Sequence, residues 1–263
     1  MKIAIIGAGN MGGAIALGLA NSSIIKASDI TCSDASSDTL NKIQALNPAI
    51  RTTPHNIEAI KKADIIFLAV KPWLIENVLL EIKSDLDYKK QIIVSVAAGI
   101  AFDQLNQILK KEEEDLPPLF RLIPNTAISV QCSMTFVAAQ NASQEQIDLI
   151  IKIFNELGTT MLIEERLAVA ATALGSCGIA YAFRYIRAVM EGGTELGLYP
   201  NQAKEIVLQT LKGAIKLLQE NDTHPEEEID KVTTPGGITI KGLNEMEHAG
   251  FTSAIIRGLK ASK

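Results

Sequence analysis

Cysteine and histidine are scarce in this chain. Its 263 residues include 3 cysteines, which are Cys32, Cys132 and Cys177, and 3 histidines. An odd number of widely spaced cysteines does not suggest a disulfide framework and is typical of a reducing compartment. Because no group of Cys, His, Asp or Glu residues has the spacing of metal ligands, we expect no metal site.

A surplus of positive charge is also missing. The 25 Lys and Arg residues are outnumbered by 30 Asp and Glu residues, so the formal net charge is -5. This balance excludes the basic field that nucleic-acid binding requires. The N-terminus has no secretory leader pattern, and no apolar run reaches the length of a membrane span. We therefore expect a cytoplasmic protein that contacts neither nucleic acid nor membrane.

Short β-rich runs alternate with helical patterns in the first part of the chain. The expected strands are residues 2–6, 29–33, 64–70, 91–96, 119–123, 133–138 and 159–163, and the expected helices are residues 11–20, 37–46, 74–83, 102–110 and 143–157. This alternation predicts an α/β fold, a Rossmann-type parallel sheet with helices on both faces. The charged run at residues 110–115 is expected to be a solvated loop.

Strand signals stop near Glu164, and helical periodicity continues from there. Apolar residues recur at spacings of three and four along residues 179–190 and again along residues 203–218. We predict two domains, residues 1–163 and an all-helical domain of residues 164–263. The broad apolar faces of the second domain predict burial against another subunit.

A glycine-rich turn follows the first expected strand. It reads Gly7-Ala8-Gly9-Asn10-Met11-Gly12 and precedes a helical pattern, which is the context of a dinucleotide-binding fingerprint. The first glycine permits a tight turn, the second lets the backbone approach a pyrophosphate, and the third allows close packing of strand and helix. The anion then lies at a helix N-terminus, so we predict dinucleotide binding.

The end of the second expected strand bears on the choice of coenzyme. Asp34 stands where a carboxylate accepts hydrogen bonds from the ribose hydroxyls, which slightly favours NADH. Ser33, Ser36 and Ser37 could instead bind the 2′-phosphate of NADPH, although no Arg or Lys lies beside them to balance its charge. The sequence therefore leaves NADPH and NADH both open.

Two more strand ends belong to the same expected edge of the sheet. Val70-Lys71-Pro72 stands at the end of one strand, where the proline ends the extended run. Ala97 and Ala98 follow the next strand, and their small side chains leave room for a flat nicotinamide ring. Strand ends at this edge normally line the ligand crevice of such folds.

The chain resembles the pyrroline-5-carboxylate reductase family in several fragments. They occur in the family's order and are residues 7–12, Ala69-Val70-Lys71-Pro72, Pro124-Asn125-Thr126 and Val232-Thr233-Thr234-Pro235-Gly236-Gly237-Ile238-Thr239. The resemblance implies reduction of 1-pyrroline-5-carboxylate to L-proline, the last step of proline biosynthesis, by hydride transfer from NADPH or NADH. It also implies a C-terminal dimerisation domain, and hence a homodimer that in some family members assembles into a ring of dimers.

The resemblance also implies roles for single residues. Thr239 matches the catalytic hydroxyl that bonds the substrate nitrogen, and Asn56 matches a contact to the adenine ribose. The substrate is a cyclic imine carboxylate, and the residues assigned to it are Thr234, Gly236, Gly237, Ile238 and Cys177. The residues assigned to the coenzyme are Gly7, Gly9, Asn10, Met11, Gly12, Asp34, Ser36, Asn56, Val70, Lys71, Pro72, Ala97 and Ala98.

The last fragment, residues 232–239, also predicts a binding site without reference to the family. The turn Pro235-Gly236-Gly237 leaves backbone N–H groups unobstructed, and with a helix after it they form an anion site suited to a carboxylate. An ordinary helix–helix loop with Thr233 or Thr234 as N-cap is the alternative.

The chain departs from the family in one segment. The family usually has Ser-Gly-Ser-Gly-Pro-Ala-Tyr where this chain reads Gly175-Ser176-Cys177-Gly178-Ile179-Ala180-Tyr181, and Ile238 replaces a Thr or a small residue. An inactive or altered-substrate family member that binds nucleotide and serves a regulatory role is therefore an alternative. A β-hydroxyacid dehydrogenase is less favoured, because its lysine base has no counterpart between Lys152 and Lys204.

Overall fold

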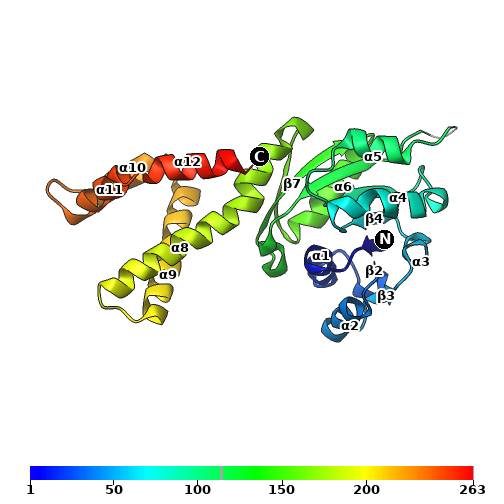
Figure 1. The fold of residues 1–263 in the computed structure, drawn as a ribbon, viewed down its shortest axis with the longest axis horizontal. Coiled ribbons are helices and arrows are strands. Elements are labelled where there is room, and N and C mark those ends of the chain that lie inside the picture. Colours follow the sequence, from blue (N-terminus) through cyan, green and yellow to red (C-terminus); the bar gives the residue numbers. More distant parts are fainter. Residues whose placement is uncertain (113–114, 263) are drawn as a thin grey trace. The chain divides into compact units, whose positions relative to one another are not determined.

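The structure is a computed structural model that describes residues 1–112 and 115–262. Glu113 and Glu114, which belong to the predicted charged loop, lie outside the described residues. The chain forms two compact units, Met1–Ser176 and Cys177–Lys263 (Figure 1). The last strand ends at Leu162, close to the expected end of the strand signals, and the functional boundary between residues 163 and 164 stays a prediction.

An eight-stranded sheet in the order β3-β2-β1-β4-β5-β6-β7-β8 forms the centre of the first unit. The strands are β1 (Ile3–Ile6), β2 (Ile30–Ser33), β3 (Arg51–Thr53), β4 (Ile65–Leu68), β5 (Ile92–Ser95), β6 (Leu119–Ile123), β7 (Ser133–Gln140) and β8 (Gly158–Leu162). Neighbouring strands are parallel except β6 and β7. The chain order reverses beside β1, which places a ligand crevice at the carboxyl ends of β1 and β4.

Helices cover both faces of this sheet. They are α1 (Asn10–Ala20), α2 (Ser37–Leu46), α3 (Asn56–Ile60), α4 (Ile75–Ile82), α5 (Phe102–Leu109) and α6 (Gln144–Asn155). One apolar core joins the sheet to α1, α2 and α6, and another joins it to α3, α4 and α5. Because β1 and β4 are buried along their whole length, their sequences are continuous apolar runs, as expected for parallel strands covered on both sides. The predicted fold class is confirmed.

Sequence patterns missed two short elements, β3 and α3. The strand Arg51–Thr53 lies at the edge of the sheet, and Arg51 is exposed. An edge strand of three polar residues contributes little to the core and therefore has no apolar run that would reveal it. Helix α3, of 5 residues, is too short to show helical periodicity.

The second unit contains only helices in its described residues. They are α8 (Gly178–Glu195), α9 (Pro200–Asn221), α10 (Pro225–Val232), α11 (Ile238–His248) and α12 (Phe251–Ala261). A tight turn with Gly197 at φ +98° joins α8 to α9 (Figure 1). The two helices approach closely where a Cβ on Gly193 would lie 3.2 Å from the Cβ of Ala203. The predicted all-helical second part is confirmed.

Few side chains are buried within the second unit. Of its residues up to 262, Ala203 and Val207 alone are buried. Large apolar side chains on its surface include Phe183, Leu196, Tyr199, Ile206, Ile215, Leu217, Val232, Ile238 and Ile256. A 60% exposed Phe183 and a 56% exposed Ile215 are far from the burial that a self-contained helical core provides, so this surface needs a partner.

A long helical stretch connects the two units. Helix α7 (Ala168–Ala171) passes through a π-helical segment, Thr172–Cys177, into α8. By length and composition alone, the 31-residue helical stretch Glu165–Glu195 could span a membrane, because its most apolar 18-residue window has a mean hydropathy of 1.4. Of that window, 17% is buried. We expected no such stretch, because the sequence shows no uninterrupted apolar run here. The mean hydropathy of one 18-residue window within this continuous helical stretch is nevertheless high enough for a membrane span.

The core between the sheet and α6 should contribute strongly to the stability of the first unit. Phe154 is fully buried, and its ring centroid lies 5.7 Å from that of Phe67 on β4. We predict that Phe154→Ala lowers the free energy of unfolding by roughly 3–5 kcal/mol, because it leaves a cavity. Leu46→Ala removes a side chain that is 68% exposed and should change stability by less than about 0.5 kcal/mol. Urea unfolding of both variants checks this, and equal effects would contradict it.

Candidate dinucleotide and substrate sites

A cavity of about 740 Å³ opens at the carboxyl ends of the central strands. Residues predicted to bind the coenzyme line it, and they are Gly7, Gly9, Asn10, Met11, Asp34, Asn56, Val70, Lys71, Pro72, Ala97 and Ala98. Gly12 and Ser36 lie outside this lining. The parallel sheet thus brings together strand ends that are far apart in the sequence.

The three glycines of the turn differ in their surroundings. Gly7 has φ +91°, and a Cβ there would lie 2.8 Å from the carbonyl carbon of Ala69. A Cβ on Gly12 would lie 1.8 Å from the carbonyl oxygen of Gly7. Gly9 has nothing within 4 Å of a Cβ position and lines the cavity. Gly7 and Gly12 are therefore required by packing within the protein, whereas Gly9 leaves space for a ligand.

The first turn of α1 points its free amides at this cavity. Its N-cap is Gly9, and within residues 1–112 and 115–262 no side chain caps the helix. Unpaired N–H groups at a helix N-terminus, together with the helix dipole, make a site for an anion such as a pyrophosphate.

Asp34 is held in place by backbone amides. Its Oδ2 accepts a hydrogen bond from the Ala8 amide at 2.8 Å, and its Oδ1 accepts one from the Ser36 amide at 2.9 Å. The carboxylate therefore ties the end of β2 to the glycine turn. The Ser36 hydroxyl accepts a hydrogen bond from the Thr39 amide at 3.3 Å and so caps α2.

A chain of polar side chains leads from β2 to α4. The buried Ser33 hydroxyl donates to Asn56 Oδ1 at 2.8 Å, and Asn56 Nδ2 donates to Glu81 Oε2 at 2.8 Å. Glu81 lines the cavity together with Asn77, one helical turn earlier in α4. Sequence reasoning missed Glu81, although the polar pair Asn77 and Glu81, spaced by four along α4, would have indicated a polar cavity face.

The cavity carries little positive charge. Among the lining residues in the described ranges, Lys71 is the only cation, whereas Asp34 and Glu81 supply carboxylates. A phosphate monoester placed near these carboxylates would meet like charges, which weakens its binding.

In the described structure, no group of three or more His, Cys, Asp or Glu side chains could hold a metal ion.

Cys32 lies on β2 behind this site and is fully buried. Burial, followed by the charge of Asp34, raises the pKa of its thiol to about 12. The thiol is therefore protonated at neutral pH and is a packing group.

The predicted substrate loop lies in the second unit. Pro235 and Gly236, with Gly236 at φ +73°, occupy the middle of a turn closed by the Gly237 amide, which donates to the Thr234 carbonyl at 2.9 Å. This is the pattern of a type II β-turn. Gly237, and neither Thr233 nor Thr234, is the N-cap of α11, and no side chain in the described chain caps that helix.

The first residues of α11 face solvent in this chain. Ile238 is 88% exposed, and its backbone amide belongs to the uncapped first turn of the helix. Thr239 follows in the first turn and is also exposed. Uncapped amides beside a free hydroxyl can bind a carboxylate and a neighbouring polar atom of a small ligand.

Gly175 and Ser176, the first two residues of the segment that departs from the family pattern, pack against β7 and the loop after β6. A Cβ on Gly175 would lie 2.4 Å from the ring of Phe136, so a serine there would displace the ring. Asn125 Nδ2 donates to the Gly175 carbonyl at 3.2 Å, and the Ser176 hydroxyl donates to the Pro124 carbonyl at 2.5 Å. Cys177, which is half-buried, ends this π-helical segment.

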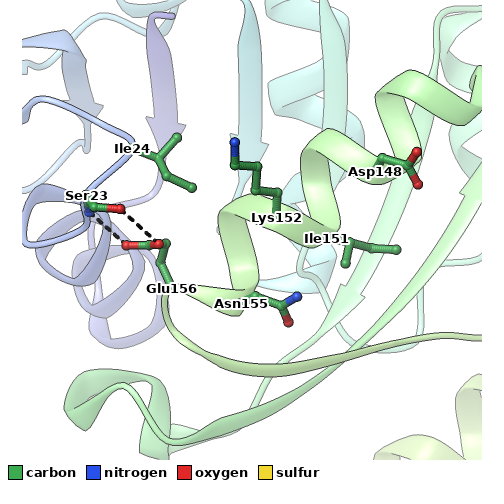
Figure 2. Close-up of a pocket in the computed structure, with 7 residues that line it drawn as sticks. All are labelled: Ser23, Ile24, Asp148, Ile151, Lys152, Asn155 and Glu156. Carbon is green, nitrogen blue, oxygen red and sulfur yellow. Dashed lines mark hydrogen bonds between the residues drawn. The ribbon is translucent and has the colours of Figure 1, made fainter.

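Another cavity, of about 670 Å³, lies beside α6 and contains none of the predicted site residues. Figure 2 shows the Glu156 carboxylate turned toward Ser23, whose amide and hydroxyl donate to it at 2.7 and 3.1 Å. Because these bonds join the loop after α1 to the end of α6, we interpret this groove as structural.

Comparison with known proteins gives matches in both units. Residues 165–263 match a family described as pyrroline-5-carboxylate reductase dimerisation, and residues 2–99 match one described as NADP oxidoreductase, coenzyme F420-dependent. Pyrroline-5-carboxylate reductase 2 of Dictyostelium discoideum is 40% identical over 276 residues, which cover 99% of this chain and 90% of that protein.

Two further proteins extend this likeness. Pyrroline-5-carboxylate reductase 1 of Dictyostelium discoideum is 39% identical over 272 residues, which cover 99% of this chain and 48% of that protein's length. The crystal structure of Plasmodium falciparum pyrroline carboxylate reductase with NADP bound has a TM-score of 0.89 and 28% identity, covering 100% of this chain and 95% of that chain. The likeness therefore extends over the whole chain.

Gly9 and Gly12 should respond differently to an added methyl group. We predict that Gly9→Ala keeps the wild-type melting temperature but weakens NADH binding by roughly tenfold or more, because its methyl group enters the space for the pyrophosphate. Gly12→Ala, in contrast, should also lower the melting temperature, because its Cβ would lie 1.8 Å from the carbonyl oxygen of Gly7. Thermal melts and titrations with NADH check this, and wild-type affinity in Gly9→Ala would contradict it.

Proposed function

The chain belongs to the pyrroline-5-carboxylate reductase family, and we propose that it reduces 1-pyrroline-5-carboxylate to L-proline with NADPH or NADH. The observation that supports this most is the presence, in one chain, of a nucleotide cavity and an uncapped α11 turn ending in Thr239. The 40% identity to a pyrroline-5-carboxylate reductase over 99% of the chain supports it further.

The reaction needs orientation more than reactive side chains. When bound, the reduced dinucleotide supplies a hydride to the carbon of the imine C=N bond. The free amides at the start of α11 hold the substrate carboxylate, and the Thr239 hydroxyl bonds the ring nitrogen as its basicity rises. The small side chains of Ala97 and Ala98 in the cavity lining leave room for the nicotinamide ring of the hydride donor. Such positioning accounts for a large part of the rate enhancement in reactions between well-oriented groups.

The choice of coenzyme depends on Asp34 in this proposal. The Plasmodium falciparum relative has NADP bound. In this chain a carboxylate, fixed by the Ala8 and Ser36 amides, lies at the end of β2. A carboxylate there accepts hydrogen bonds from the ribose hydroxyls of NADH and repels the 2′-phosphate of NADPH. Both coenzymes are proposed to work, with NADH slightly favoured.

The helical part is proposed to form a homodimer. The match of residues 165–263 to a dimerisation family and the exposed apolar side chains of the second unit both support a second copy as the partner. Such a partner would also cover part of the apolar stretch Glu165–Glu195, so we propose a cytoplasmic protein without a membrane span. Further assembly into a ring of dimers belongs to the same proposal.

The proposal is tested by following nicotinamide absorbance with 1-pyrroline-5-carboxylate, running NADH and NADPH in parallel. Oxidation of the coenzyme with proline as product supports it. Tight coenzyme binding without turnover would contradict it and would favour the altered-substrate or regulatory alternative. In a separate assay, the protein should not oxidise 3-hydroxyisobutyrate with NAD or NADP. That reaction needs a lysine as general base, and no lysine lies between Lys152 and Lys204.

Thr239 should matter for turnover but not for coenzyme binding. We predict that Thr239→Ala lowers kcat by roughly 10- to 100-fold, the effect of losing one hydrogen bond to a charged group. The NADH dissociation constant should stay at its wild-type value, because the glycine turn is untouched. Thr239→Ser keeps the hydroxyl and should retain most of the activity. Equal loss of coenzyme binding in Thr239→Ala would contradict this role.

Asp34 should set the ratio of coenzyme affinities. We predict that Asp34→Asn, which keeps an acceptor oxygen but loses the charge, shifts the NADPH-to-NADH affinity ratio about tenfold toward NADPH. Asp38→Asn removes an exposed carboxylate from the same region and serves as the control. Titrations with both coenzymes check this, and an unchanged ratio would mean that Asp34 does not face the ribose.

A further inference from the structure

The start of α5 is capped by a residue that is distant in the sequence. Ala101 precedes the helix and has no side-chain acceptor, so the first N–H groups of α5 depend on other partners. The Phe102 amide donates to Glu165 Oε1 at 2.8 Å. Glu165 therefore fixes the position of a helix that begins just after the cavity residues Ala97 and Ala98.

The same carboxylate oxygen pairs with a partly buried cation. Arg121 Nη1 lies 2.5 Å from Glu165 Oε1, and the guanidinium carbon lies 5.9 Å from the centre of the Phe102 ring. Arg121 stands on β6 beside Ser95, its register partner on β5. Three separate parts of the chain, β6, the start of α5 and the segment after β8, thus meet at one carboxylate.

A neighbouring pair shows what is unusual about this one. The side chains of Arg121 and Glu165 are 11% and 33% exposed, whereas those of Arg166 and Glu164 are 71% and 69% exposed. Solvent screens an exposed pair, which then contributes little. A partly buried pair keeps its geometry, and removal of one member leaves a charge without its partner.

The location of the pair connects it to the coenzyme cavity. Residues 97–101 run from the end of β5 to the start of α5, and their first two members line the cavity where the small side chains leave room for the nicotinamide. Arg121 lies beside the strand that enters this segment, and Glu165 holds the helix that leaves it. The Arg121–Glu165 pair therefore fixes both ends of residues 97–101.

We propose that Glu165, together with Arg121, is a positioning residue for the nicotinamide half of the coenzyme. It acts through residues 97–101 and does not touch the ligand. The adenine half lies by the glycine turn, Asp34 and Asn56, which do not depend on this pair. The inference rests on the proposed function only in treating the 740 Å³ cavity as the dinucleotide site, and it requires no turnover of an imine.

The test compares two ligands that differ in the nicotinamide. NADH carries it and ADP-ribose does not, so the ratio of their dissociation constants measures the contribution of the nicotinamide. Binding is followed through Trp73, the single tryptophan of the chain, which stands beside the cavity residue Pro72. We expect Glu165→Gln to raise the dissociation constant of NADH roughly tenfold, the size expected for a lost charged hydrogen bond. The dissociation constant of ADP-ribose should stay unchanged.

Two further variants make the result decisive. Glu164→Gln removes the adjacent, exposed carboxylate and should leave both ligands unchanged. Arg121→Lys keeps the charge but loses the planar fork, so it should weaken NADH less than Glu165→Gln does; if Glu165→Gln does not fold, Arg121→Lys decides the question alone. Equal weakening of NADH and ADP-ribose, or no weakening of either, would overturn the proposal. Wild-type NADH binding without imine reduction would contradict the proposed function and leave this comparison intact.

Discussion

The contact between the glycine turn and the end of β4 is the constraint on which the nucleotide cavity depends. A Cβ on Gly12 would lie 1.8 Å from the Gly7 carbonyl oxygen, and one on Gly7 would lie 2.8 Å from Ala69. Only a turn without side chains at these two positions lets α1 start directly above β1. Its free amides then lie at the carboxyl edge of the sheet, where four other strand ends and loops complete the cavity.

Most polar groups around that cavity are also used to hold its walls. Asp34 binds the Ala8 and Ser36 amides, and Asn56 joins Ser33 to Glu81. Such groups are oriented before any ligand arrives, so little reorganisation is needed on binding. The same bonds fix the carboxylates of Asp34 and Glu81 in the cavity lining, so the negative charge of the cavity is a consequence of its structural hydrogen bonds.

The sequence predicted the architecture and most of the cavity lining because both follow from simple rules. Apolar runs mark covered parallel strands, and the ends of such strands meet at one edge. The polar edge strand β3 and the short helix α3 have neither signal. Glu81 was missed because helix α4 reads as a core element, and the glycine at position 175 is explained only by Phe136, which lies on another strand. Contacts between distant segments are not visible in local patterns.

The most direct test of the central claim follows the hydride itself. NADH deuterated at C4 of the nicotinamide is incubated with the protein and 1-pyrroline-5-carboxylate, and the product is analysed by mass spectrometry and NMR. If the chain catalyses the proposed reduction, proline carries deuterium at the former imine carbon. Proline without deuterium from either face of the nicotinamide, or no proline at all, would contradict the account.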